Sequence, residues 1–438
     1  MIANYLYARN NRTYDAKKSE EIAAVVNPAI EAVRADLPLS TALYAGDVPA
    51  ALTRAFAHAE SLIKSQREDG SWAYTPDKEH EVFGTPGDTS SGLTALRSKE
   101  LLEHALITGD ATARDAGLKG LAFLDTTARP EGAQTWELPL HVPDILASAH
   151  LVTAYLNGYR ITDEKRYLDR AVYWAKSGLP FVYLWSAADQ PIMRYGTIPV
   201  FGSTWYDKQP WFGVIVQWCG LEYGYALDKL AEHDSSMPWK QIARGILHCA
   251  VQQQQYTKKE YPQNAGMYPD AFSPILGKEQ YHWDINPRLI ARNLMRELGM
   301  DTEPATQKVL DRQSQMLTLT LPAQSLKMNY SMDWIRSEFN YAVGATIYAV
   351  VSGVYRPESF ELNGKAINLL KDISAAPIGW VYDEARTLSV VKMVTGGENK
   401  FVIDLINHEM RQAPGASVEK PTDPAADKRE QPDTNAVE

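Results

Sequence analysis

Helical segments come in pairs along most of this chain of 438 residues, and the turn inside each pair is short. Over 90–126 the turn reads Thr108-Gly109-Asp110, and glycine is favoured just after a helix while aspartate is favoured just before one. The design recurs with a period of about 50–65 residues, which is typical of helical arrays. The predicted pairs are 18–34 with 48–65, 92–106 with 113–124, 144–160 with 167–177, 211–230 with 238–254 and 287–298 with 303–316, and a helix over 339–352 opens an incomplete sixth.

The links between the pairs are much longer than the turns within them, and loops of this length are usually functional or disordered. In a ring of hairpins each link leaves an outer helix and enters an inner one, so all of the links share one rim. The first helix of several pairs also carries small residues such as Gly92, Ala149 and Gly220, which permit close approach near an axis. We therefore predict a mainly α fold, an (α/α)5–6 toroid over 1–354, with rim loops at 68–89, 128–143, 178–210, 256–284 and 317–338.

The pattern changes after Tyr355, where apolar and polar residues begin to alternate. Asn363-Gly364 and Gly396-Gly397 separate the alternating runs, as hairpin turns do. This predicts a small antiparallel β appendage over 355–410. From 411 to 438 the chain has proline, alanine and charged residues but no aromatic residue, which predicts a disordered tail.

Composition narrows the classes of function. The net charge of −10 and the lack of a lysine- and arginine-rich run argue against nucleic acid and against an anionic membrane surface as partners. There is no apolar run long enough to span a bilayer, and the start lacks the apolar core of a signal peptide. We expect a soluble protein that stays in the cytoplasm unless the N-terminus has been trimmed. The oligomeric state is left open.

No cofactor and no metal are predicted. The chain lacks a His-Glu-x-x-His motif, a phosphate-binding glycine loop and a Gly-x-Ser-x-Gly elbow. Its two cysteines, Cys219 and Cys249, stand in apolar helical contexts and read as buried thiols.

The rim loops are rich in tryptophan and tyrosine beside carboxylates. Aromatic faces stack on sugar rings while carboxylates accept hydrogen bonds from hydroxyl groups, so this composition predicts a carbohydrate cleft. The alternative is that the aromatic residues anchor the loops and that Asp88, Asp144 and Asp284 are helix N-caps. The predicted substrate-binding residues are Trp72, Asp88, Trp136, Trp205, Trp211, Tyr268, Trp283, Arg288 and Trp334.

Glu137 and Asp270 are the predicted acid and base of a glycoside hydrolase. Hydrolysis of a glycosidic bond needs one carboxylic acid to protonate the leaving oxygen and a second carboxylate as base or nucleophile. The two residues stand in different rim loops, each flanked by aromatic residues and a proline. The competing interpretation is that Glu137 bonds loop backbone and Asp270 caps the next turn.

A second chemistry is left open by His141, Tyr206 and His282. A polysaccharide lyase uses such a base to remove the proton beside a uronate carboxylate, and a group such as Arg288 neutralises that carboxylate. Tyr268 is a further candidate for these roles. The third alternative is a carbohydrate-binding or scaffold toroid without catalysis.

Two turns carry a resemblance to a known superfamily. Ile107-Thr-Gly-Asp110 and the segment from Arg160 to Ala171 are similar to the hairpin turns of the six-hairpin glycosidase-like superfamily, over roughly residues 20–352. The resemblance implies a toroid of the kind used by glycoside hydrolases and polysaccharide lyases, and it implies no particular catalytic residue. The segment from Gln66 to Trp72 resembles the Gln-to-Trp repeats of terpenoid cyclases, another toroid group, but the Asp-rich motifs of those enzymes are absent.

Overall fold

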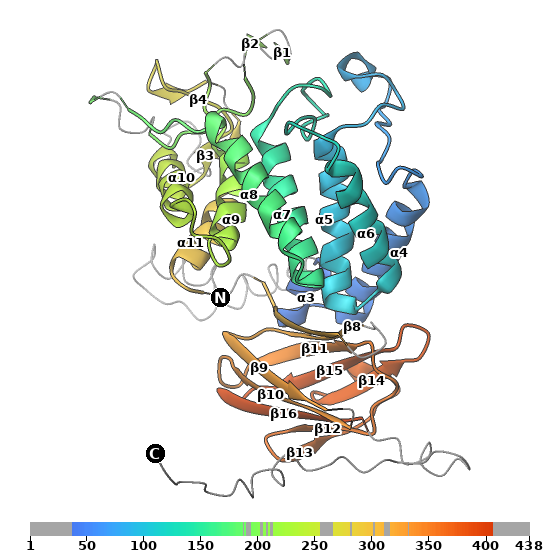
Figure 1. Cartoon of the computed structure of the whole chain (residues 1–438). Coiled ribbons are helices and arrows are strands. Elements are labelled where there is room, and N and C mark those ends of the chain that lie inside the picture. Colours follow the sequence, from blue (N-terminus) through green and yellow to red (C-terminus); the bar gives the residue numbers. More distant parts are fainter. Residues whose placement is uncertain are drawn as a thin grey trace, which may run out of the picture.

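The computed structural model describes residues 37–405, apart from 187, 190–193, 202–204, 207–208, 211–212, 255–265, 281–282, 301–302, 311–315 and 332. Helices occupy the N-terminal part of the described chain and β-sheets the C-terminal part, stacked end to end (Figure 1). The predicted segment 18–34 and the predicted tail over 411–438 lie outside the described residues.

Three predicted helical hairpins are confirmed. They are α5 (Ser91–Thr108) with α6 (Ala111–Leu124), α7 (Ile145–Thr162) with α8 (Lys165–Gly178), and α9 (Gln217–Leu230) with α10 (Trp239–Gln253). In the first hairpin Gly109 ends α5 with a left-handed φ of 69°, and the Asp110 side chain caps α6 by accepting from the backbone N–H groups of Thr112 and Ala113. The turn chemistry read from the sequence therefore operates as expected.

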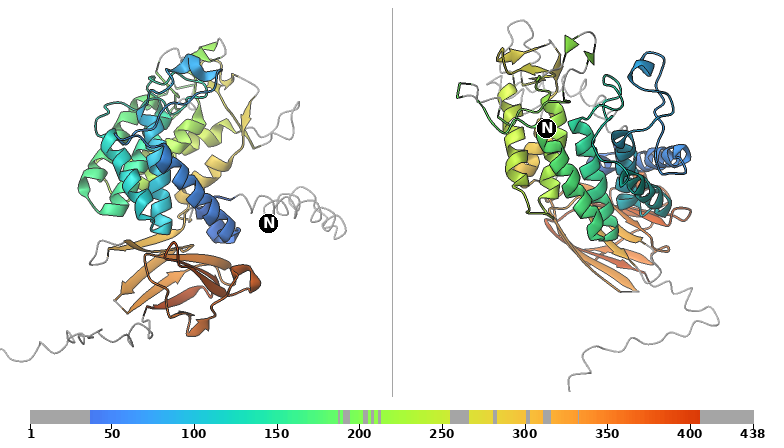
Figure 2. Two further views of the ribbon diagram at one scale, coloured as in Figure 1. Left: turned by 90° about the vertical axis from the view of Figure 1, so that its right-hand side faces the viewer. Right: turned by 45° about the horizontal axis from the view of Figure 1, so that its top comes forward.

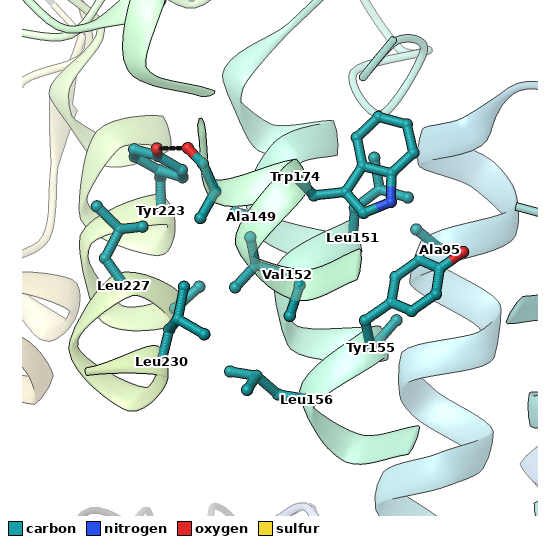
Figure 3. Packing of buried hydrophobic residues seen from close by; sticks show 14 of the residues in the cluster. Ala95, Ala149, Leu151, Val152, Tyr155, Leu156, Trp174, Tyr223, Leu227 and Leu230 are labelled. Atoms are coloured by element: carbon teal, nitrogen blue, oxygen red, sulfur yellow. Dashed lines mark hydrogen bonds between the residues drawn. The ribbon is translucent and has the colours of Figure 1, made fainter. Parts of the chain in front are cut away.

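The first helices of these hairpins form an inner row. α5 packs on α7 and α7 on α9, while α6, α8 and α10 lie outside them. α3 (Leu39–Ala45) and α4 (Val48–Ser65) precede the row, and α11 (Arg288–Glu297) continues it beside α9. Figure 3 shows the core, in which Leu151, Val152 and Leu156 of α7 lie between α5 and α9. The described helices thus form an arc, as the two further views in Figure 2 show.

The described parts of the four links before α5, α7, α9 and α11 gather at one end of the arc, together with the short strands β1 to β4 (Figure 1). These strands are β1 (Trp205–Tyr206), β2 (Gln209–Pro210), β3 (Tyr268–Pro269) and β4 (Phe272–Ser273); β5 (Lys278–Glu279) pairs with β4, and β6 (Asp284–Ile285) pairs with β3. We call this end the rim. The hairpin turns lie at the opposite end.

The fifth predicted rim link and two predicted helices are wrong. Residues 303–316, 317–338 and 339–352 contribute strands instead. In β10 (Trp334–Asn340), buried and exposed positions alternate, and β11 (Thr346–Ser352) is rich in β-branched residues. A short apolar run of this kind fits either a helix or a buried strand by periodicity, and pairing with distant strands decided the outcome.

The C-terminal part is a sandwich of two five-stranded antiparallel sheets among the described residues, in the orders β13-β12-β16-β10-β9 and β14-β15-β11-β8-β7. Its apolar inner faces form a second core that includes Phe339, Phe360 and Phe401. A C-terminal antiparallel sheet was predicted, but it begins at Ala305 rather than near 355. The remaining strands are β7 (Ala305–Leu310), β8 (Met316–Leu321), β9 (Ser325–Tyr330), β12 (Ser359–Leu362), β13 (Lys365–Ile367), β14 (Gly379–Asp383), β15 (Leu388–Val394) and β16 (Glu398–Asp404).

The sandwich covers the hairpin-turn end of the arc. α3 packs on β11 through a shared apolar cluster, and the Lys308 ammonium group lies 2.7 Å from an Asp163 carboxylate oxygen at the turn between α7 and α8. A Cβ on Gly109 would come within 3.1 Å of Ser352 Cβ, so this turn and the sheet fit closely. The rim is therefore the end of the arc that stays uncovered by the sandwich. No helix in the described part of the chain is both long enough and apolar enough to cross a membrane.

Candidate active site

Glu137 and Asp270, predicted from separate loops, lie near one another on the rim. Asp270 follows β3, and its backbone N–H donates to the Trp283 carbonyl at 2.9 Å. Glu137 closes a turn by donating its backbone N–H to the Gln134 carbonyl at 3.2 Å. Both side chains are only partly exposed, and the negative charge of Asp270 acts on Glu137. The fold therefore brings two half-buried carboxyl groups into electrostatic contact.

A stacked pair of tryptophans holds the two carboxyl groups. The rings of Trp136 and Trp218 lie with centroids 6.2 Å apart and planes tilted by 29°. The Trp218 indole N–H donates to an Asp270 carboxylate oxygen at 2.9 Å, and the Trp136 side chain hydrogen-bonds Glu137. Each carboxyl group is thus oriented by one member of the pair, and an indole can only donate, so both bonds favour an ionised acceptor.

The two carboxyl groups nevertheless favour protonation. Burial and then the charge of Asp270 raise the pKa of Glu137 to about 7, against the opposing hydrogen bond from Trp136. Burial also raises the pKa of Asp270, and the N–H of Trp218 opposes that rise. Near neutral pH Glu137 is therefore divided between its protonated and ionised forms, beside a second carboxyl group whose pKa is also raised.

Asp144 is a buried N-cap, as the structural interpretation proposed. Its carboxylate accepts from the backbone N–H of Ala147 at 2.7 Å in the first turn of α7 and from that of Ala133 at 3.0 Å in the rim loop. Burial raises the pKa of Asp144 to about 7. The side chain thereby fixes the loop that carries Glu137 to the start of α7.

Two other predicted N-caps are wrong. Ser90, not Asp88, caps α5, because its hydroxyl accepts from the backbone N–H of Leu93. Asp284 lies in β6, where it pairs with Pro269 of β3. The residue at the N-cap position of α11 is Pro287. Asp88 is instead exposed on the rim, where its carboxylate lies 3.7 Å from His141 Nε2.

His141 is more than half exposed and lies between two carboxylates. Its Nδ1 is 3.2 Å from Glu131, and its Nε2 faces Asp88. Glu131 is in turn bound by Arg129 at 2.5 Å. His141 therefore shares the rim with Glu137 and Asp270, but its side-chain contacts are with Glu131 and Asp88.

A small pocket of about 270 Å³ adjoins Trp218 on the rim. One wall is apolar, with Ile285 and Leu289, and the polar groups belong to Asp284, Asn286 and Arg288. Two further predicted platforms have open ring surfaces nearby: Trp283, whose backbone holds Asp270, is 65% exposed, and Trp136 is 47% exposed. Aromatic surfaces, a carboxylate, an amide and a guanidinium are the groups that bind sugars.

Three predicted substrate-binding residues do not face the rim cleft. Trp72 is buried in the helical core, and its indole N–H donates to the Leu62 carbonyl at 2.9 Å. Tyr268 is fully buried in an apolar cluster between α9, α10 and α11. Trp334 lies in β10 of the sandwich, with the Arg336 guanidinium 4.5 Å from its ring centre. Trp72 and Tyr268 therefore fit the anchoring interpretation, because each ring is buried between helices, whereas Trp334 is partly exposed on the sandwich, away from the rim.

Trp205, Tyr206, Trp211 and His282 complete the set of predicted site residues. Trp205 and Tyr206 form β1 on the rim, paired with β2, but their side chains lie outside the described set. Trp211 and His282 lie outside the described residues altogether. Within the described part of the chain, no cluster of three His, Cys, Asp or Glu residues could hold a metal ion.

The sequence analysis missed Trp218. This residue lies in the first turn of α9, within a predicted helix rather than within one of the predicted rim loops. Its position is the missed signal, since the first turn of an inner helix directly follows a rim link and can face the same cleft.

No protein-family model matches the chain, and no curated protein matches it. Among solved structures, an unsaturated glucuronyl hydrolase from Bacillus sp. GL1 aligns with 14% identity and a TM-score of 0.40, over 58% of this chain and 70% of that one. A family 76 mannosidase from Bacteroides thetaiotaomicron aligns with 11% identity and a TM-score of 0.40, over 62% and 76% of the two chains. No residue role is transferred from such partial alignments.

Proposed function

We propose that this protein is a carbohydrate-active enzyme that hydrolyses glycosidic bonds of an oligo- or polysaccharide. The observation that carries the proposal is the coupled pair of Glu137 and Asp270, one carboxyl group with a pKa raised to about 7 and the other beside an indole N–H. Two carboxyl groups whose surroundings separate their protonation states are what acid and base catalysis requires.

Glu137 is the general acid in this proposal. It donates its proton to the glycosidic oxygen as the bond from that oxygen to the anomeric carbon breaks. Asp270 either takes a proton from the water that attacks the anomeric carbon or attacks that carbon itself, and water then releases the sugar. In the first route the proton taken by Asp270 must be lost to solvent and Glu137 must take one up before the next turnover, whereas in the second route Glu137 recovers its proton from the water that releases the sugar.

The surroundings supply binding groups for the sugar rings. The exposed faces of Trp136 and Trp283 offer stacking surfaces beside the pair. The pocket next to Trp218 offers Asn286 and Arg288 as hydrogen-bond partners for hydroxyl groups. Asp88 and the β1 residues Trp205 and Tyr206 are candidates for further contacts on the same rim, and Trp211 and His282 remain predicted site residues outside the described part of the chain.

The test is a panel of neutral and uronate-containing oligo- and polysaccharides, read for new reducing ends and for ultraviolet absorbance. A hydrolase produces reducing ends without an unsaturated product. Glu137→Gln should lower the rate roughly 100-fold or more, the usual contribution of a general acid. The matched control is Glu79→Gln, an exposed rim carboxylate, which should leave the rate unchanged.

Two outcomes would replace this proposal. Reducing ends that arise together with absorbance from a conjugated double bond would identify a lyase, and His141 would then be the first base to replace. Binding of a glycan without turnover by the unmodified chain would identify a binding or scaffold protein.

A further inference from the structure

The loop that carries Glu137 contains a fully buried glutamine, Gln134. Glu137 itself, three residues later, is partly exposed on the rim. The Gln134 carbonyl group accepts from the backbone N–H groups of Glu137 at 3.2 Å and of Leu138 at 2.9 Å. These two bonds form the turn that presents Glu137, so the direction of the Glu137 side chain depends on where Gln134 lies.

The Gln134 side chain lies between the rim ends of two inner helices. Its amide oxygen accepts from the Cys219 thiol, in the first turn of α9, at 3.5 Å. The same side chain acts on the carboxyl group of Asp144, the N-cap of α7, and opposes the rise in the pKa of that group. One buried side chain therefore connects the loop of Glu137 to both α7 and α9.

The residue before Gln134 is packed against the same two helices. Ala133 forms a small apolar cluster with two residues of α7, and the Trp218 ring of α9 packs against that cluster. Trp218 also donates its indole N–H to Asp270. The segment 133–134 therefore joins the loop of Glu137 to the helix that holds Asp270.

Cys219 supplies Gln134 with a hydrogen-bond donor that carries no charge. Burial, and then the negative charges of Glu137, Asp144 and Asp270, hold the pKa of the Cys219 thiol well above its usual range. The thiol therefore stays protonated at neutral pH. A neutral donor can fix Gln134 without placing a cation beside the carboxyl pair, where it would favour the ionised form of Glu137.

We propose that Gln134, held in place by Cys219, is a positioning residue for Glu137. By fixing the Glu137 loop to α7 and α9, it sets the spacing between Glu137 and Asp270. It acts through the loop and not on the sugar, because its side chain is fully buried. The role in catalysis rests on the proposed hydrolysis, whereas the role in spacing the two carboxyl groups does not.

Gln134→Met gives the first test, since methionine is also unbranched but has no amide group. Loss of the contacts with α7 and α9 should let the loop move away from Asp270. The pKa of Glu137 should then fall from about 7 to below about 6, because the charge of Asp270 and burial both raise it. NMR titration of Glu137 in the parent and variant chains measures the change without any substrate. An unchanged pKa in a folded variant would overturn the proposal.

The two buried cysteines offer a matched comparison. Cys219→Ala removes the donor to Gln134, whereas Cys249→Ala removes a thiol that accepts from Gln253 at 3.4 Å. Cys219→Ala should lower the pKa of Glu137, and Cys219→Ser, which keeps a donor, should restore it. Cys249→Ala should leave the pKa as in the parent chain. Equal effects of the two alanine variants would show a general loss of packing and contradict the positioning role.

Circular dichroism checks that each variant keeps its helices. If Gln134→Met does not fold, the set of Cys219 and Cys249 variants decides the proposal by the same titration. A folded Cys219→Ala chain whose Glu137 titrates as in the parent would contradict the contact between Cys219 and Gln134 as the one that fixes the loop.

Turnover separates this inference from the proposed hydrolysis. On the first oligo- or polysaccharide that the parent chain cleaves, Gln134→Met should lower kcat about tenfold and change KM by less than about twofold, because the acid is displaced and the binding surfaces are not. A raised KM with an unchanged kcat would overturn the positioning role. If the parent chain cleaves none of them, the proposed function fails, and the NMR titration still decides whether Gln134 sets the spacing of the pair.

Discussion

Two partly buried glutamates at opposite ends of the helical arc respond to their surroundings in opposite ways. On the rim, burial and a neighbouring negative charge raise the pKa of Glu137 to about 7. At the hairpin-turn end, Glu303 accepts from the Lys229 ammonium group at 2.8 Å and from the Tyr225 hydroxyl at 2.7 Å. Those partners outweigh burial and lower the pKa of Glu303 to about 2.

The two glutamates differ in whether a cationic side chain lies beside them. Glu303 has an ammonium partner, so its charge is stabilised and it ties α9 to the chain leading into β7. Glu137 has an indole and a second carboxylate instead, so it keeps a proton near neutral pH. A buried carboxyl group with a cation supports structure, whereas one without a cation and with a raised pKa is a candidate for proton transfer.

The largest effect is expected for Asp270→Asn, which removes the negative charge facing Glu137. Turnover should fall roughly 100-fold or more, because the base or nucleophile is lost. The pKa of Glu137 should fall below about 7, since one of its two causes has gone. A titration of Glu137 followed by NMR in the variant and in the parent chain measures the shift, and an unchanged pKa would show that the two groups are not coupled.

The two glutamates should affect stability with opposite dependence on pH. The pKa of Glu137 is raised from the ordinary value of 4.5 to about 7, so its contribution is fully present below about 4.5 and is lost as pH rises to about 7, by at most about 3 kcal/mol. The pKa of Glu303 is lowered to about 2, so its contribution is present above about 4.5 and is lost as pH falls below that value.

Urea unfolding of the parent, Glu137→Gln and Glu303→Gln chains between pH 3 and pH 8, a range of roughly five units, separates the two contributions. The loss of stability above about pH 4.5 should be smaller in Glu137→Gln than in the parent. The same loss in both chains would mean that Glu137 titrates as an ordinary exposed carboxyl group.

Lys229→Met should cost about 1–2 kcal/mol of unfolding free energy, because Glu303 then keeps a poorly solvated charge without its cation, and the partial exposure of Glu303 limits the cost. Lys240→Met, on the exposed side of α10, should cost close to nothing. Urea denaturation measures both, and equal stability of the two variants would remove the structural role assigned to Glu303.

The smallest effect is expected for Trp218→Phe, which keeps the aromatic ring but removes the N–H bonded to Asp270. The pKa of Asp270 should rise, so the acidic limb of the rate profile should move to higher pH. Trp136→Phe should instead move the alkaline limb upward, because its N–H lowers the pKa of Glu137. If the same limb of the pH–rate profile moved in both variants, the assignment of each indole to its own carboxyl group would be contradicted.

Local signals in the sequence predicted the hairpins and the site within them. Gly109 and Asp110 predicted the turn between α5 and α6. The preference of glycine for a left-handed conformation and that of aspartate for the N-cap position depend on few neighbouring residues. The separate loops of Glu137 and Asp270 could be placed on one rim because the alternation of helices leaves only one end for long links.

What the sequence by itself determined is therefore the hairpins from α5 to α10 and the rim that carries the two carboxyl groups. Only the tertiary structure decided that the chain from Ala305 onward forms a sandwich that includes Trp334, that Trp72 and Tyr268 are buried between helices, and that Trp218 orients Asp270. The physical reason is range: caps and periodicity act within a few residues, whereas strand pairing, burial and the pKa of a carboxyl group depend on residues far away in the chain.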